Sequence, residues 1–271
     1  MTALLLTLVL CAADAPISDA PSPPAASPTL DPGDSPSAAQ FPRPSLLRLL
    51  TNTAESMARP LRPQWGDAFI IIPAIVGTIL ALHYDPQIHA ALQQLPDPII
   101  GGQELSYWGS YLGEGWVDLG VFLALGLFGG RSGQRAAIAG IPALLAVGVV
   151  SRVGKLIFRL ERPSYDPTAH HWFSRPNADA MPSGHTMAAF ATAAVLASEW
   201  PRLAPLFYAL ATYVGIARVQ NSTHWMSDVV VGAALGTLMG LEAWRVTREF
   251  ELEVQPWLTG GGAGFSVSRQ F

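Results

Sequence analysis

Six apolar stretches constrain the fold of this chain more than any other feature of its sequence. Each is rich in alanine, glycine, leucine, isoleucine or valine, and none has a lysine or arginine in its middle. They cover residues 68–82, 116–130, 136–151, 186–198, 204–217 and 229–243. Only 13% of the residues are charged, against about 25% in soluble domains, so little of the chain is suited to face water. The sequence predicts an all-α fold, a transmembrane bundle of six helices.

The length of the stretches leaves a second interpretation open. Each is shorter than the roughly 18 apolar residues that mark a membrane-spanning helix. A soluble, very apolar helical bundle is therefore the alternative. Small residues favour the membrane, because they allow close helix packing in lipid; they include Gly77, Gly120, Gly126, Gly232, Gly236 and Gly240.

The chain outside the stretches divides into segments of different composition. Residues 1–15 contain an apolar run that ends in a small-x-small pattern, as a cleaved signal does, although no basic residue precedes it. Residues 16–44 contain nine prolines, which predicts a disordered linker. Residues 45–244 form the expected helical domain, whose first helix lies either at a membrane interface or against the core. Residues 245–271 form a polar, glycine-rich tail whose last seven residues alternate like a strand.

The lysines and arginines orient the predicted bundle, because such residues concentrate on the cytoplasmic side of membrane proteins. None occurs between Arg62 and Arg131, so the connection after the first stretch is expected outside the cytoplasm. The cytoplasmic side is marked by Arg131, Arg135, Arg202, Arg245 and Arg248. The basic residues on the external side need another explanation: they are Arg152, Lys155, Arg159, Arg162, Arg175 and Arg218. This orientation places the N-terminus inside, which conflicts with a cleaved signal.

Three motifs contain half of these external basic residues. They are Lys155, six residues and Arg162-Pro163; then Pro182-Ser183-Gly184-His185; then Arg218, five residues, His224, three residues and Asp228. Taken singly, each is also typical of an ordinary turn or helix end. All three fall at ends of apolar stretches on the same predicted side, and this joint occurrence favours a catalytic site.

The residue types in the motifs suit a bound phosphate. Three cations are available for an anion with several charged oxygens, arginine through a bidentate fork and lysine as a point charge; they are Lys155, Arg162 and Arg218. The backbone N–H groups of Ser183, Gly184 and His185 precede an apolar helix, so they are expected to point at an anion at its N-terminus. Gly184 also allows close backbone approach.

The two histidines divide the expected covalent chemistry. Because His224 and Asp228 are four residues apart, the carboxylate can hold one imidazole nitrogen and present the other as a nucleophile. His185 would protonate the departing oxygen and then activate water. Ser227 is expected to cap the sixth helix. The motifs thus predict hydrolysis of a phosphoester through a phosphohistidine.

These motifs resemble those of the type 2 phosphatidic acid phosphatase superfamily, which includes lipid phosphatases, bacterial acid phosphatases and vanadium haloperoxidases. The resemblance spans about residues 68–244. It implies that His224 is the nucleophile supported by Asp228 and that His185 is the acid. It also implies a set of phosphate-binding residues: Lys155, Arg162, Ser183, Gly184 and Arg218. The chain departs from the family at Ala217, where serine is usual before the arginine, and this replacement removes a hydrogen-bonding group near the site.

The predicted substrate is a lipid phosphate, because the site lies at a membrane surface on the periplasmic or exterior side. Candidates are undecaprenyl pyrophosphate, phosphatidylglycerol phosphate, phosphatidic acid and a lipid A phosphate. Alternatives are a soluble periplasmic acid phosphatase, a vanadate-dependent haloperoxidase, a phosphotransferase or a non-catalytic lipid-binding protein.

Other partners and cofactors are not expected. The net charge is −4 and no basic cluster stands apart from the motifs, so a nucleic-acid partner is not predicted. No metal is expected either, because the three cations would repel a divalent ion beside His185, His224 and Asp228. Cys11 is the single cysteine and excludes an internal disulfide. The neighbouring His170 and His171 are expected to be polar surface, and Trp225 to be a core or interface aromatic.

Overall fold

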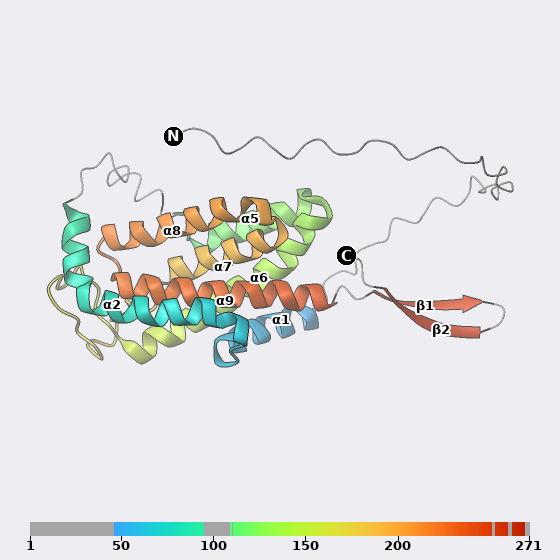
Figure 1. The fold of residues 1–271 in the computed structure, drawn as a ribbon, viewed down its shortest axis with the longest axis horizontal. Coiled ribbons are helices and arrows are strands. Elements are labelled where there is room, and N and C mark those ends of the chain that lie inside the picture. Colours follow the sequence, from blue (N-terminus) through green and yellow to red (C-terminus); the bar gives the residue numbers. More distant parts are fainter. Residues whose placement is uncertain (1–45, 95–108, 110, 251–252, 260–261, 269–271) are drawn as a thin grey trace, which may run out of the picture. The chain divides into compact units, whose positions relative to one another are not determined.

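Each of the six apolar stretches falls on a helix in the computed structural model, which describes residues 46–94, 109, 111–250, 253–259 and 262–268 (Figure 1). The α-helices of this described part are α1 (Leu46–Ala58), α2 (Ala68–Gln93), α5 (Gly115–Phe128), α6 (Gly130–Phe158), α7 (Gly184–Glu199), α8 (Ala204–Gln220) and α9 (Met226–Phe250). Short 3-10 turns are η1 (Arg59–Leu61), η2 (Trp65–Asp67) and η3 (Pro201–Leu203). The all-α, six-helix bundle is therefore confirmed, with α1 as an additional helix.

The ends of the chain relate to the predicted segments as follows. The predicted signal at 1–15 and linker at 16–44 lie outside the described residues. Helix α9 continues to Phe250, beyond the predicted end of the helical domain at residue 244. Strands β1 (Glu253–Thr259) and β2 (Gly262–Ser268) then pair antiparallel. The predicted strand-like alternation falls on β2 as far as Ser268, and its last three residues lie outside the described part.

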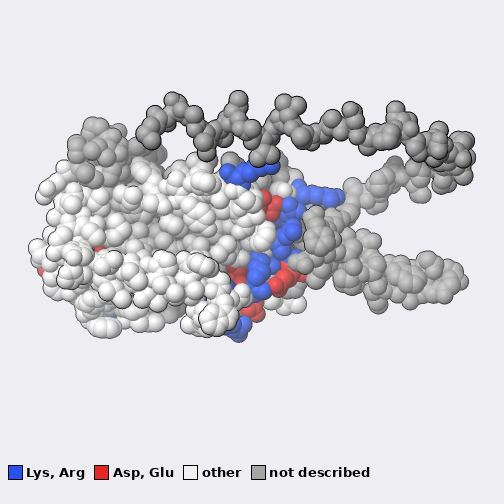
Figure 2. Space-filling view, viewed as in Figure 1, with Lys and Arg blue, Asp and Glu red and all other residues white. Residues whose placement is uncertain are grey.

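The outer surface of the bundle is suited to lipid. Three helical segments of the described part are long and apolar enough to cross a membrane, namely Trp65–Gln93, Gly130–Phe158 and Met226–Glu249, whereas α5 is shorter. Large apolar side chains point outward on several helices, including Phe69, Ile79, Leu127, Leu156 and Leu206. Figure 2 shows a largely uncharged surface over the helices, with charged side chains gathered near the end of the bundle where α9 ends. Such continuous apolar surface is rare on soluble proteins, and the fold is that of a membrane protein.

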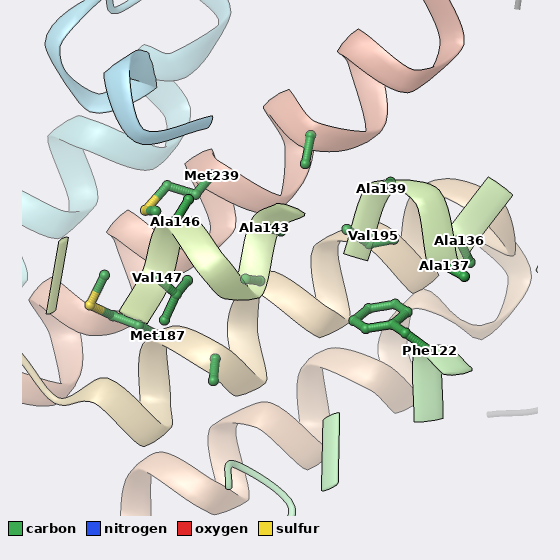
Figure 3. Close-up of a cluster of buried hydrophobic side chains, with 13 residues drawn as sticks. Phe122, Ala136, Ala137, Ala139, Ala143, Ala146, Val147, Met187, Val195 and Met239 are labelled. Carbon is green, nitrogen blue, oxygen red and sulfur yellow. The ribbon is translucent and has the colours of Figure 1, made fainter. Parts of the chain in front are cut away.

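Alanines and a few larger side chains fill the core between α5, α6, α7 and α9 (Figure 3). Phe122 of α5 is fully buried against the alanines of α6. A Cβ atom on Gly140 of α6 would lie 2.2 Å from the Phe122 ring, so this ring requires glycine opposite it. The small side chains bring helix backbones together, as expected for helix packing in lipid.

Helices α7 and α9 touch along a stripe of glycines. Gly232, Gly236 and Gly240 lie four residues apart on α9, and a Cβ atom on each would lie 2.3–2.8 Å from a backbone carbonyl oxygen of α7. Those oxygens belong to Ser183, Met187 and Ala191. The predicted packing role of these glycines is confirmed. This contact fixes the N-terminus of α7 against the first turns of α9.

Helix α1 packs against α6 and α9 with polar residues inward and leucines outward. Asn52 donates from Nδ2 to the Ala243 oxygen over 3.1 Å and to Thr247 Oγ1 over 2.8 Å. Leu46 and Leu47 are exposed. The helix therefore lies on the core and still presents apolar side chains outward.

Candidate active site

The three motifs meet at one end of the bundle because neighbouring helices run in opposite directions. Lys155 lies in the last turn of α6 and His185 in the first turn of α7. Arg218 lies in the last turn of α8 and Asp228 in the first turn of α9. The predicted site residues are thus brought together from four consecutive helices, and their catalytic roles remain predictions.

Two of the three cations share a carboxylate that sequence reasoning did not identify. Arg162 donates from Nε and from Nη2 to the two oxygens of Asp179, each over 2.8 Å. Lys155 Nζ lies 3.8 Å from Asp179 Oδ2. Asp179 thus occupies the arginine fork in the bidentate manner that phosphate also adopts.

Arg218 has a buried donor available. Its Nε is buried and has no hydrogen-bond partner among the described residues. Its positive charge lies within electrostatic range of Arg162, which in turn lies within range of Lys155. Three neighbouring cations and a buried donor without a protein partner are suited to bind an anion.

The start of α7 corrects one detail of the predicted phosphate cradle. The backbone N–H of Ser183 donates to the Asp228 carbonyl over 3.2 Å, so it ties α7 to α9 and does not face an anion as predicted. Ser183 is fully buried, and its Oγ accepts a hydrogen bond from Thr186. Gly184 and His185 form the first turn, where an α-helix leaves N–H groups without intrahelical partners. A Cβ on Gly184 would lie 2.9 Å from Ser151 Oγ, so glycine lets α7 approach α6 closely here.

The loop between α8 and α9 holds His224 beside Arg218. The Arg218 carbonyl accepts the N–H groups of Thr223 over 3.2 Å and of His224 over 3.3 Å, and the Thr223 hydroxyl over 2.8 Å. The loop therefore folds tightly over the end of α8, which explains the spacing of five residues in the third motif. Ala217, the departure from the family pattern, is fully buried, and its carbonyl accepts the Asn221 N–H.

Asp228 contacts both the nucleophile candidate and the helix start. His224 Nδ1 lies 3.4 Å from Asp228 Oδ2, which also accepts the Trp225 N–H over 2.9 Å. This second bond is half of a capping box, in which the third helical residue satisfies the N-cap N–H. The prediction that Ser227 caps this helix is wrong, because α9 already begins at Met226.

His224 lies in the loop before α9 and has 1% of its surface exposed. Burial lowers the pKa of His224 well below its ordinary value, and nearby positive charges add to this effect; they are Arg218, Lys155, Arg162 and His185. A buried imidazole among cations is held neutral, and a neutral imidazole nitrogen is a nucleophile.

Asp85 is a second residue that the sequence did not single out. It is fully buried in α2 and accepts the Ser227 N–H over 3.1 Å and the Ser227 hydroxyl over 2.6 Å. His170 Nε2 lies 3.0 Å from the same carboxylate, and its ring packs edge-on against Trp225. The expectation that His170 is polar surface is wrong, whereas Trp225 is a core residue as predicted.

The fold of α2 explains how Asp85 reaches the site. Figure 1 shows that α2 bends, and Pro86 lies within it beside Asp85. Proline removes a helical hydrogen bond and is a common cause of such bends. Beyond the bend, His89 Nε2 lies 2.9 Å from Ser222 Oγ in the loop before α9.

A cleft of about 420 Å³ opens beside the motifs. Its charged and polar lining includes Glu114, Arg152, Lys155 and His185, and its lining deeper along α6 and α7 is apolar. Glu114 Oε1 lies 2.8 Å from His185 Nε2. Glu114 and Asp85 are both carboxylates at the end of the bundle where the sequence places the external basic residues. That shared position is the sequence feature that could have identified them.

Comparisons with known proteins find similar sequences and structures. The model of the PAP2 superfamily matches residues 137–251. A lipid A 1-phosphatase of Porphyromonas gingivalis is 34% identical over 114 residues, which are 41% of this chain and 23% of that protein. A decaprenylphosphoryl-5-phosphoribose phosphatase of Mycobacterium tuberculosis is 29% identical over 153 residues, 56% of this chain and 82% of that protein.

Two solved structures are similar to part of this chain. Aquifex aeolicus LpxE is 23% identical, with 59% of this chain and 93% of that chain covered at a TM-score of 0.49. A transmembrane PAP2-type phosphatidylglycerolphosphate phosphatase from Bacillus subtilis is 20% identical, with 69% and 96% covered at a TM-score of 0.48. This chain spans less than a quarter of the length of the Porphyromonas protein. Residues 137–251 of this chain are similar to the PAP2 superfamily.

Proposed function

We propose that this protein hydrolyses a phosphomonoester or pyrophosphate of a membrane lipid, without a metal ion, through a phosphohistidine on His224. The observation that carries the proposal is the buried His224, held by Asp228 and surrounded by positive charges at the bundle end where His185 also lies. Both sequence relatives are named as phosphatases that act on lipid-linked phosphates.

The first chemical step is phosphoryl transfer to the enzyme. Asp228 holds His224 Nδ1, so Nε2 attacks phosphorus and a P–N bond forms. The bond from phosphorus to the leaving oxygen breaks, its electron pair stays on that oxygen, and His185 supplies a proton. Positive charge from Arg218, Lys155 and Arg162 stabilises the phosphoryl oxygens in the transition state.

The second step is hydrolysis of the phosphohistidine. His185, now neutral, takes a proton from water as the water oxygen bonds to phosphorus. The P–N bond breaks, its electron pair returns to His224, and inorganic phosphate is released. Both proton transfers use one residue, which regains its starting state after each turnover.

The cleft supports a lipid substrate. Its lining passes from Lys155 and His185 to Val147 and Leu144 along α6. Lys155 and Leu144 are eleven residues apart, which is roughly 16 Å along a helix. A phosphate at the charged end would therefore leave room for an apolar chain beside the helices. The exposed apolar surface of the bundle disfavours the soluble acid phosphatase alternative.

The substrate candidates share a phosphate on an amphiphile, and the site is proposed to face the periplasm or exterior. Undecaprenyl pyrophosphate, phosphatidylglycerol phosphate, phosphatidic acid and lipid A phosphate all fit this class. The orientation is supported by the arginines at the opposite end, among them Arg131, Arg202 and Arg248.

The test is phosphate release by the detergent-solubilised full chain in EDTA. A panel of these lipids and p-nitrophenyl phosphate would be compared for wild type, His224→Ala and the control His83→Ala, whose side chain is exposed on α2. We expect release by wild type and the control, loss in His224→Ala, and an alkali-stable phosphoprotein trapped by rapid quenching of wild type. Absence of release from every compound, or release that requires an added divalent metal, would overturn the proposal.

A further inference from the structure

Glu114 contacts the histidine that the proposed mechanism uses as its acid and base. The residue precedes α5 as its N-cap, and its carboxylate oxygen lies 2.8 Å from His185 Nε2. It also lies before residues 137–251, the part of the chain that matches the superfamily. The contact therefore joins the matched region to a helix outside it.

The backbone around Glu114 is built to hold this contact. A Cβ atom on Gly113 would lie 2.7 Å from the His185 carbonyl oxygen and 2.6 Å from Val214 Cγ1, so only glycine fits. The Glu114 backbone is extended, and its carbonyl accepts the N–H groups of Val117 over 2.8 Å and Asp118 over 3.1 Å. The start of α5 thus packs against the start of α7. This packing places the Glu114 carboxylate beside His185.

The groups around His185 are mainly positive, so a carboxylate at this position would stabilise its protonated form. Cations lie near His185 on two other helices. The charged or titratable groups around it are Arg152 and Lys155 of α6, Arg218 of α8, His224 before α9, and Glu114 before α5. Positive neighbours disfavour the imidazolium that a general acid needs. Among the described residues, Glu114 is the carboxylate in contact with His185.

We propose that Glu114 is a positioning residue for His185, which it holds through Nε2 so that Nδ1 exchanges protons with the reaction. This inference rests on the proposed function. When the bond between phosphorus and the leaving oxygen breaks, that oxygen takes the proton from Nδ1. When water attacks the phosphohistidine, the water proton moves to Nδ1. In both steps the Glu114 side chain accepts the Nε2–H and stabilises the protonated imidazole, as the carboxylate of a catalytic triad does.

The test is Glu114→Gln in the detergent-solubilised full chain, assayed with two leaving groups. An alkyl phosphate lipid releases a poor leaving group that needs a proton, whereas p-nitrophenyl phosphate releases a stable phenolate. We expect kcat/KM for the lipid to fall about ten- to a hundredfold and kcat/KM for the aryl phosphate to fall less than about threefold. With the lipid, the basic limb of the pH profile should move to lower pH while KM changes little.

A matched control and the contrary outcomes complete the experiment. Glu161→Gln removes a carboxylate that pairs with Arg175 on the loop after α6, and both rates should stay as in wild type. Equal losses with both substrates and an unmoved pH profile would overturn the inference, as would a gain in activity, which would mean that the carboxylate obstructs the site. Wild type that releases phosphate from neither compound would overturn the proposed function itself, and the inference with it.

Discussion

Two pairs of histidine and carboxylate carry the proposed chemistry, and they differ in almost every respect. His224 and Asp228 are four residues apart, fully buried, and joined over 3.4 Å through Nδ1. His185 and Glu114 are 71 residues apart, partly exposed at the cleft, and joined over 2.8 Å through Nε2. The buried pair suits a nucleophile that must stay neutral and fixed. The exposed pair suits a group that exchanges protons with a leaving group and with water.

Removal of the nucleophile should have the largest effect. His224→Ala eliminates the proposed nucleophile, so kcat/KM for both lipid and aryl phosphates should fall at least about 10⁴-fold. The assay is steady-state phosphate release in EDTA, together with trapping of the phosphoprotein. A variant that retains more than a tenth of the activity would assign the nucleophile to another residue.

Replacement of the buried carboxyl group should have the next largest effect. Asp228→Asn keeps an oxygen that can accept the Trp225 N–H, so the start of α9 should persist. The imidazole loses its carboxyl partner, and kcat/KM should fall about 10³-fold with either leaving group. The comparison with Glu114→Gln sharpens the contrast between the pairs, because only the exposed pair should discriminate between leaving groups. A loss in Asp228→Asn that depends on the leaving group would make the two pairs equivalent.

The acid limb of the pH profile tests how the buried pair is charged. Because the pKa of His224 is lowered, its neutral form persists to lower pH, and activity is lost only when pH falls through that lowered value. Between pH 6.5 and 5, kcat/KM corrected for substrate ionisation should not fall, whereas an ordinary imidazole would lose about fifteenfold. Enzyme held at pH 5 and assayed at pH 7 controls for unfolding. An acid limb near pH 6.5 would contradict this.

The sequence predicted the local pair and missed the distant one for a physical reason. His224 and Asp228 share one loop and one helix turn, so their spacing nearly determines their contact. Glu114 reaches His185 only because α5 packs beside α7, and a carboxylate between two glycines looks ordinary in the sequence. The six helices could be predicted because the apolar composition of each segment indicates a helix without any knowledge of its neighbours.

The errors at the site have a common origin as well. Local helix rules predict that Ser227 caps a helix and that the Ser183 N–H faces an anion. Such rules hold only when no other element supplies a hydrogen-bond partner. Asp85 and the carbonyl of Asp228 are such partners, and each comes from another helix. His170 was assigned to the surface because the segment around it is polar. Its contact with Asp85 depends on how α2 bends, which the pattern of residues did not specify.

The smallest expected effect on activity comes from Asp85, which contacts Ser227 next to the buried pair of His224 and Asp228. Asp85→Asn keeps the shape of a fully buried side chain but turns one acceptor into a donor that faces the Ser227 hydroxyl and His170. We expect a loss of about 1–3 kcal/mol in the free energy of unfolding and about a tenfold fall in kcat with KM unchanged, because Ser227 adjoins Asp228. Thermal unfolding in detergent and steady-state kinetics measure the two effects. Glu55→Gln, which removes a partly exposed carboxylate of α1 beside Arg62, is the control and should change neither. If Asp85→Asn lowered stability but left kcat unchanged, the α2 contact would serve the fold alone, and the buried pair would depend only on the loop and first turn that contain it.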